Sequence, residues 1–132
     1  MAAVFCDTSV LIRYFAEDDI PRAAAAATLI DGESTVTIST TVILETLHVL
    51  RRRYGFGDAL LGKLLVAFLT RDNVELADAD KSGVLAAISS NQGSTRRIPD
   101  AIIAMAAAQA DVDYIATFDA KLRTPLVPVR ML

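Results

Sequence analysis

Residues 4–12 read Val4-Phe5-Cys6-Asp7-Thr8-Ser9-Val10-Leu11-Ile12 and decide how this chain begins to fold. The apolar run before Asp7 is typical of a short buried strand. Thr8 or Ser9 can cap a helix that begins near Val10, because such side chains accept hydrogen bonds from the first free backbone N–H groups of a helix. A strand that passes directly into a helix is the repeating unit of α/β proteins.

Short strands and helices alternate along the rest of the chain. Further strands are predicted at 35–38, 73–76, 114–116 and 126–129, and further helices at 21–30, 40–53, 58–70 and 99–110, with one more beginning at Asp78 or Asp80. This order favours a parallel sheet covered by helices on both faces. The helix at 99–110 is apolar nearly all round, so we expect it to be buried on more than one side. No repeat or linker interrupts the pattern, so residues 1–132 are predicted to form a single domain.

The composition excludes several classes of protein. The chain has 132 residues, 53% of them hydrophobic and 22% charged, which is typical of a folded domain and not of a disordered one. No apolar stretch reaches the roughly 18 residues of a membrane span, and no signal peptide is expected. Cys6 is the single cysteine, so a disulfide within the chain is impossible and a cytoplasmic protein is expected. Cys6 and the lone His48 do not suffice for a zinc site.

The net charge is −3, from 13 basic and 16 acidic residues. Nucleic-acid-binding proteins are usually basic, so this value at first disfavours RNA as a ligand. Setting aside four candidate metal-binding acids leaves a net charge of +1, and bound divalent ions would raise the local potential further. The charge therefore does not exclude RNA.

Those four acids are Asp7, Glu45, Asp100 and Asp119. Asp7 and Asp119 follow predicted strands, and sites in parallel sheets lie at the carboxyl ends of strands. If those two strands are adjacent, the two acids are expected to be neighbours. Each acid also has a purely structural interpretation: a helix cap or turn for Asp7, a solvated helix face for Glu45, a favourable helix dipole for Asp100 and an ordinary loop for Asp119. Their joint placement favours a metal site, because carboxylate oxygens are the ligands that Mg²⁺ and Mn²⁺ prefer.

Four segments in order resemble the PIN-domain ribonucleases, and within them the VapC-type toxins of type II toxin–antitoxin pairs. The matching segments are residues 4–12, Ser39-Thr40-Thr41-Val42-Ile43-Leu44-Glu45, Ile98-Pro99-Asp100-Ala101-Ile102-Ile103-Ala104 and Ile115-Ala116-Thr117-Phe118-Asp119. No single segment is specific, but together they span nearly the whole chain. The resemblance implies a three-layer α/β/α sandwich with a short parallel, roughly five-stranded sheet. It also implies a Mg²⁺- or Mn²⁺-dependent endoribonuclease.

Carried over by position, Asp7, Glu45, Asp100 and Asp119 would be the acidic quartet of that family. Glu45 would bind the metal or orient the attacking water, and both roles stay open. Supporting hydroxyls match at Thr8, Ser9 and Thr117. Candidate contacts to RNA phosphates are Arg13, Arg52, Arg96 and Arg97. Arg52 shares a helical stripe with Glu45, whereas Arg96 and Arg97 are also explained by an ordinary solvated loop.

Other interpretations remain. A haloacid-dehalogenase-like phosphatase needs a second acid two positions after the first, where this chain has Ser9. A response-regulator receiver needs an adjacent acidic pair near the N-terminus and a late lysine directly after a strand, and neither pattern is present. Within the PIN family, the alternatives to a toxin are an RNA-processing nuclease and a catalytically silent scaffold. A toxin would imply RNA as substrate, a cognate antitoxin protein and a homodimer, with the helices at 10–16, 21–30 and 58–70 as candidate interface surfaces.

Overall fold

The computed structural model describes residues 2–132 and contains six α-helices, one short 3₁₀ helix and five strands within that range. The strands are β1 (Ala3–Phe5), β2 (Thr35–Ile38), β3 (Val74–Leu76), β4 (Ile115–Thr117) and β5 (Val129–Met131). The helices are α1 (Thr8–Ala16), α2 (Ile20–Ile30), α3 (Thr40–Arg52), α4 (Asp58–Leu69), α5 (Lys81–Ser89), η1 (Thr95–Arg97) and α6 (Ile98–Gln109). The predicted alternation of strands and helices is confirmed, while η1 was not anticipated.

The strands form two parallel sheets. β2 lies between β1 and β3, with Val4 opposite Val36 and Val36 opposite Val74. β4 pairs in parallel with β5, with Ile115 opposite Val129. The α/β class with short parallel strands, consistent with a PIN-like α/β/α fold, is thereby confirmed. The five strands divide into a sheet of three and a sheet of two, so β1 and β4 are not paired.

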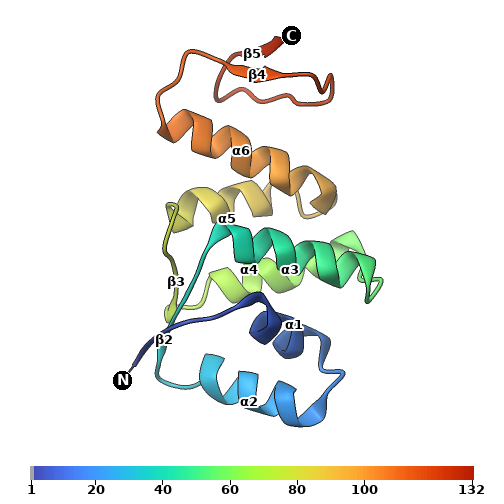
Figure 1. The fold of residues 1–132 in the computed structure, drawn as a ribbon, viewed down its shortest axis with the longest axis vertical. Coiled ribbons are helices and arrows are strands. Elements are labelled where there is room, and N and C mark those ends of the chain that lie inside the picture. Colours follow the sequence, from blue (N-terminus) through green and yellow to red (C-terminus); the bar gives the residue numbers. More distant parts are fainter. Residues whose placement is uncertain (1) are drawn as a thin grey trace.

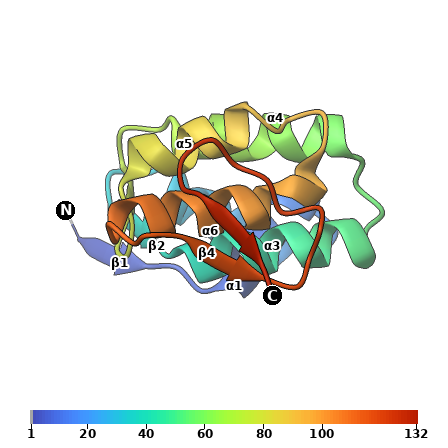
Figure 2. The ribbon, with the colours of Figure 1, turned by 90° about the horizontal axis from the view of Figure 1, so that it is seen from above.

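The elements are stacked along the long axis of the molecule (Figure 1). From one end to the other the order is α2, α1, the pair α3 and α4, then α5, α6 and the β4–β5 ribbon. Viewed along that axis, β4 and β5 lie over α6 (Figure 2). α1 packs against both α2 and α3, and α5 packs against α6. The segment that follows β1 and the segment that follows β4 therefore lie in different layers.

Local sequence signals explain where most helices begin. Pro21 and Pro99 stand in the first turns of α2 and α6, where the missing N–H of proline costs no hydrogen bond. Ser39 caps α3 by accepting a hydrogen bond from the backbone N–H of Val42. Of the two predicted caps of the first helix, Asp7 is confirmed and the pair Thr8 and Ser9 was wrong, because α1 begins at Thr8. Asp is as good a cap as Ser, so the strand end and the helix start share one residue.

The core follows the helical periodicity read from the sequence. On α3 the side chains of Ile43, Leu47 and Leu50 are buried, and Cys6 is buried directly after β1 as an apolar filler. The burial predicted for α6 on more than one side is confirmed in part, because α6 lies between α5 and the β4–β5 ribbon (Figure 1). Ile102 and Ala104, on different sides of the helix, are buried, whereas Ile103 is 50% exposed.

The last strand also departs from the prediction. It begins at Val129, after Pro128 and not before it, and the carbonyl of Pro128 accepts a hydrogen bond from Ile115 N–H (2.8 Å). Proline has no backbone N–H to donate to the hydrogen bonds of a sheet, so the strand begins at the next residue, which has one. None of the helices between residues 2 and 132 is both long enough and apolar enough to span a bilayer.

Candidate active site

Asp7 lies exposed just beyond the carboxyl end of β1 and caps α1. Its Oδ2 accepts hydrogen bonds from the Ser9 hydroxyl (2.8 Å) and the Ser9 backbone N–H (3.3 Å). The Ser9 hydroxyl, followed by its backbone N–H, lowers the pKa of the Asp7 carboxyl below its usual value, because both bonds favour the ionised form. Asp7 is therefore a carboxylate at neutral pH. Thr8, the other candidate hydroxyl beside it, is buried.

The carboxyl edge of the three-stranded sheet carries a second acid, Asp78, that the sequence reasoning did not treat as a site residue. Asp78 lies two residues beyond β3, as Asp7 lies two residues beyond β1. Its two oxygens accept hydrogen bonds from the backbone N–H (3.0 Å) and the hydroxyl (2.7 Å) of Thr40, at the start of α3. The strand-end rule applied to Asp7 would have found it. Because Thr40 engages both oxygens, Asp78 holds α3 against this edge.

Glu45 lies on the exposed face of α3. Thr41, His48 and Arg52 are exposed on the same stripe, as their helical spacing predicts. α3 packs against α1, whose cap is Asp7, so Asp7 and Glu45 belong to neighbouring elements.

Asp100 and Asp119 line one cleft, here called the basic cleft. Asp100 is half-buried in the first turn of α6, and Asp119 is exposed in the loop after β4. The cleft has a volume of about 1250 Å³ and lies between α5, α6 and residues 119–126. The Thr117 hydroxyl accepts a hydrogen bond from Asp119 N–H (2.9 Å), and Asp119 Oδ1 accepts one from Lys121 N–H (2.9 Å). These two turns fix the loop that carries Asp119 over the cleft.

A buried polar cluster anchors the segment just before Asp100. Thr95 is fully buried, and its hydroxyl accepts a hydrogen bond from the Arg51 guanidinium and donates one to Asp58 Oδ1. Arg51 Nη2 also lies 3.4 Å from Asp58 Oδ1. The bond from Thr95 is the main cause of a lowered pKa at Asp58. The cluster ties the C-terminus of α3 and the N-terminus of α4 to η1, which carries Arg96 and Arg97 into α6.

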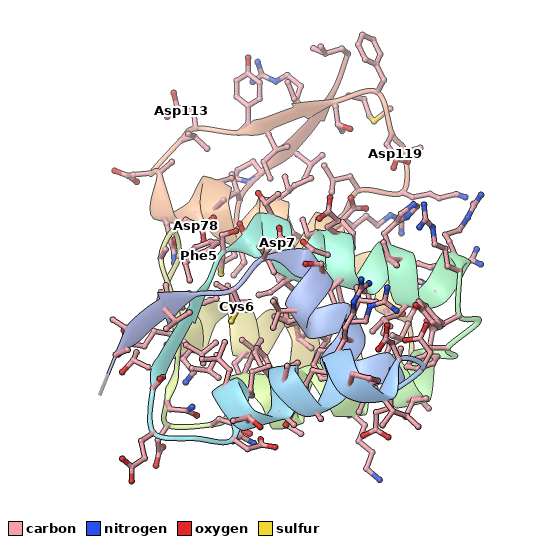
Figure 3. All side chains as sticks on the ribbon, turned by 60° about the horizontal axis from the view of Figure 1, so that its bottom comes forward. Phe5, Cys6, Asp7, Asp78, Asp113 and Asp119 are labelled. Atoms are coloured by element: carbon pink, nitrogen blue, oxygen red, sulfur yellow. The ribbon has the colours of Figure 1, made fainter. Side chains whose placement is uncertain are left out.

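The structure places two of the four acids in one cleft and the other two outside its lining. Figure 3 shows Asp7 at the start of α1 and Asp119 in the loop beyond β4, apart in the view. Asp100 and Asp119 share the basic cleft, whereas Asp7 and Glu45 are not among its lining residues. Asp7 and Asp119 were expected to be neighbours if the strands before them were adjacent. Those strands, β1 and β4, lie in separate sheets.

The four acids can be compared with the ligands that a divalent metal ion requires. Carboxylate oxygens suit Mg²⁺ and Mn²⁺, and within residues 2–132 neither Glu45 nor Asp100 takes part in an ion pair that would occupy it. Among the described residues, however, no group of three or more His, Cys, Asp or Glu side chains is placed to hold a metal ion. The donors thus fit a divalent ion in their chemistry, and the metal-binding role of the quartet stays a prediction.

The candidate RNA contacts have different environments. Arg13 Nη1 donates to both carboxylate oxygens of Asp18 (3.1 and 3.2 Å), so an acid already engages it. Arg52 is exposed on the stripe of Glu45, and Arg96 and Arg97 are exposed and line the basic cleft. Two further cations line that cleft, Lys121 and Arg123, which the sequence reasoning missed as contacts. Their signal was present in the sequence, since they follow Asp119 by two and four residues.

The sequence profile of the PIN domain family matches residues 4–125, which is nearly the whole chain. The match covers β2, β3, β4 and all of β1 except Ala3, and it includes all four acids. A search of curated proteins gives no match.

Proposed function

Since the chain belongs to the PIN domain family, whose members are generally nucleases, we propose that it is a Mg²⁺- or Mn²⁺-dependent endoribonuclease and the toxin of a VapBC-type pair. The observation that carries the proposal is the basic cleft, where Asp100 and Asp119 lie among exposed cations. Metal-assisted phosphodiester cleavage needs acidic side chains that bind the metal ion and basic side chains that bind the phosphate. The proposal treats residues 1–132 as a single PIN domain.

The residues have distinct roles in this proposal. Asp7, Asp100 and Asp119 would hold the divalent ion directly or through water, and Glu45 would complete that set or orient the attacking water. When bound, such an ion activates water and stabilises charge on the phosphate oxygens. Ser9 keeps Asp7 ionised and oriented, and Thr117 fixes the turn that presents Asp119. Carboxylates brought close together repel one another, so Mg²⁺ or Mn²⁺ should stabilise the fold.

The toxin assignment rests on the resemblance of the four segments to VapC-type proteins. It carries three further expectations: a cytoplasmic location, a cognate antitoxin that covers the acids, and a homodimer. Induction of the protein in cells should arrest growth, and co-expression of a small neighbouring reading frame should relieve the arrest. Arrest without any such relief would favour an RNA-processing nuclease over a toxin.

For the homodimer we propose the groove formed by α1, α2 and α4, three helices already expected to supply an interface. The groove has a volume of about 620 Å³ and is lined by Tyr14, Phe15 and Phe68, whose rings lie 5.4–6.3 Å apart. Ile20 lines it while remaining 80% exposed. Burying such an apolar rim against a second copy would remove it from water.

A catalytically silent PIN scaffold is the second candidate, and one observation favours it. Asp7 and Asp119 follow strands in different sheets, and among residues 2–132 no three acids are gathered for a metal. A scaffold would bind RNA or a protein without cleaving RNA. A cleavage assay therefore distinguishes the nuclease from the scaffold.

The test is cleavage of total cellular RNA by the purified protein with Mg²⁺, with Mn²⁺ or with EDTA. Asp7→Asn and Asp100→Asn should abolish discrete, metal-dependent cuts while leaving the circular dichroism spectrum unchanged. Asp113→Asn is the matched control, because Asp113 is an exposed acid outside the basic cleft. Cleavage retained in both site variants would refute the proposed mechanism, and cutting in EDTA shared by all variants would indicate a contaminating nuclease.

A further inference from the structure

The buried polar cluster joins three elements that are distant in the sequence. Arg51 is the second-last residue of α3, Asp58 is the first residue of α4, and Thr95 is the first residue of η1. Thr95 lies 44 residues from Arg51 and 37 residues from Asp58, so the cluster forms only when the chain folds. Both α4 and α6 pack against η1. The cluster therefore stands where α3, α4 and the start of α6 meet.

The hydroxyl of Thr95 is the centre of this cluster, and both of its bonding roles are filled. It accepts a hydrogen bond from Arg51 and donates one to Asp58, whose carboxylate also lies 3.4 Å from the Arg51 guanidinium. Thr46 is equally buried, but its hydroxyl has no partner among the described residues. A buried polar group with every bond satisfied fixes one arrangement of its neighbours. Thr95 can therefore lock the elements that it joins, whereas Thr46 cannot.

Two helices lack a local cap, and both begin at this cluster. Of the six α-helices within residues 2–132, α1, α2, α3 and α5 start with a side-chain cap hydrogen bond. The caps of α4 and α6, Gly57 and Arg97, make no such bond. α4 begins at Asp58 itself, and α6 follows directly from η1 at Ile98. Because the first N–H groups of a helix have no partner within it, an uncapped start needs support from elsewhere.

The cluster lies between two of the candidate acids in the chain of elements. Asp100 stands in the first turn of α6, five residues after Thr95. Glu45 stands on α3, six residues before Arg51, which is about 9 Å along a helix axis. The Thr95 hydroxyl is thus a side-chain link between the helix that carries Glu45 and the helix start that carries Asp100.

We infer that Thr95 is a positioning residue of the candidate active site, whose hydroxyl acts through Arg51 and Asp58 to fix where Asp100 stands relative to Glu45. The inference rests on the proposed nuclease function, which it deepens by assigning a role to a residue that is fully buried and makes no contact with RNA. A misplacement of about 1 Å at a reacting group can cost about 100-fold in rate. Loss of the Thr95 hydroxyl should therefore slow cleavage although Asp100 itself is intact.

The first measurement is cleavage of one defined RNA in the presence of Mg²⁺, with kcat and KM determined separately. Thr95→Val keeps the β-branched shape and removes the hydroxyl, so it should lower kcat by about 10- to 100-fold and change KM much less. Thr95→Ser keeps the hydroxyl and should retain most of the parental kcat. The matched control is Thr46→Val, the same substitution at an equally buried threonine without a partner, which should leave kcat unchanged.

The second measurement is amide hydrogen exchange without metal or RNA, which does not depend on activity. Thr95→Val should speed exchange in η1 and in the first turn of α6, while α1 and α2 exchange as in the parent, because helix ends open locally. Ile30→Val removes a buried methylene group from α2 and is the control for a general loss of stability. It should leave exchange in η1 and at the start of α6 unchanged.

Asp58→Ala provides a second variant should Thr95→Val fail to fold. The side chain of Asp58 is 38% exposed, so its removal leaves no large cavity. It removes the acceptor of the Thr95 hydroxyl and should lower kcat and speed exchange in the same places. Because both changes break the same bond, the double variant should lose little more than either single variant.

Three outcomes would overturn the inference: a Thr95→Val variant with parental kcat, a Thr95→Ser variant as slow as Thr95→Val, or exchange at the start of α6 that ignores the loss of the hydroxyl. Failure of the nuclease proposal looks different, because the parent itself would then not cleave RNA under Mg²⁺ or Mn²⁺. Faster exchange confined to η1 and the start of α6 would in that case still support the link through Thr95, and unchanged exchange would refute it.

Discussion

The hydroxyl of Thr46 is the sharpest test of how the core is packed. Thr46 lies on α3 next to Glu45, is fully buried, and its Oγ1 has no hydrogen-bond partner among the described residues. A buried polar group without a partner costs about 1–3 kcal/mol. Thr46→Val replaces the hydroxyl with a methyl group of nearly the same shape and keeps the β-branch, so helix propensity changes little. We expect the variant to be more stable than the parent by about 1–2 kcal/mol.

The assay is urea unfolding followed by circular dichroism, with the midpoint rising and the slope m unchanged. For a chain of this length the gain corresponds to a rise in Tm of about 3–6 °C per kcal/mol. Thr95→Val is the matched control, because Thr95 is equally buried but bonded to Asp58 and Arg51, and it should destabilise the protein. A loss of stability in Thr46→Val comparable to that in Thr95→Val would refute the reasoning and show that the Thr46 hydroxyl has a partner.

Three further predictions follow from the packing and the charges. Leu11 is fully buried on the inner face of α1, so Leu11→Ala should lower the free energy of unfolding by about 2–5 kcal/mol in the same urea assay. A loss below about 1 kcal/mol would contradict its place in the core. The Tyr54 hydroxyl donates a hydrogen bond to Asp18 (2.8 Å), and this bond is the largest cause of the lowered pKa of Asp18 and of the raised pKa of Tyr54. The stabilisation that the bond gives is therefore present between the unfolded-state pKa values of the two groups, near pH 4 and near pH 10, and is lost below and above them. Unfolding of Tyr54→Phe and the parent across pH should show the difference at neutral pH and its disappearance in acid; a difference that persists at pH 2 would argue against this bond. Ile20→Asp should convert a homodimer to a monomer in light scattering without loss of helicity, whereas an unchanged mass would place the interface elsewhere.

Local features of the fold were predictable because they depend on residues close together in the sequence. On α3 the buried Ile43 and Leu47 and the exposed Glu45 follow from a spacing of three and four residues. Pro21 and Ser39 fixed helix starts through backbone chemistry that needs no tertiary contact. The order of strands and helices was read correctly for the same reason.

Features that depend on distant pairing were not predictable. Nothing in the sequence near Ile115 says that β4 pairs with β5 rather than with β1, because short apolar strands are interchangeable as neighbours. The same limit hid the bond between Asp78 and Thr40, which lie 38 residues apart, and the clamp on Thr95, although the place of Asp78 just beyond a strand was a local signal. Of the cations that line the basic cleft, Arg96 and Arg97 were predicted because they stand close to Asp100 in the sequence. Lys121 was missed because its place in the cleft depends on where its loop lies.

The most direct test of the central claim is whether Asp7 and Asp119, which follow strands in separate sheets, act on the same phosphodiester. Single-turnover cleavage of one defined RNA by Asp7→Asn, Asp119→Asn and the double variant forms a mutant cycle. Residues that act as a unit are strongly non-additive, so each single variant should lose nearly all activity and the double variant should lose little more. Near-parental cleavage by Asp119→Asn, or losses that simply multiply in the double variant, would contradict a single site built from both acids.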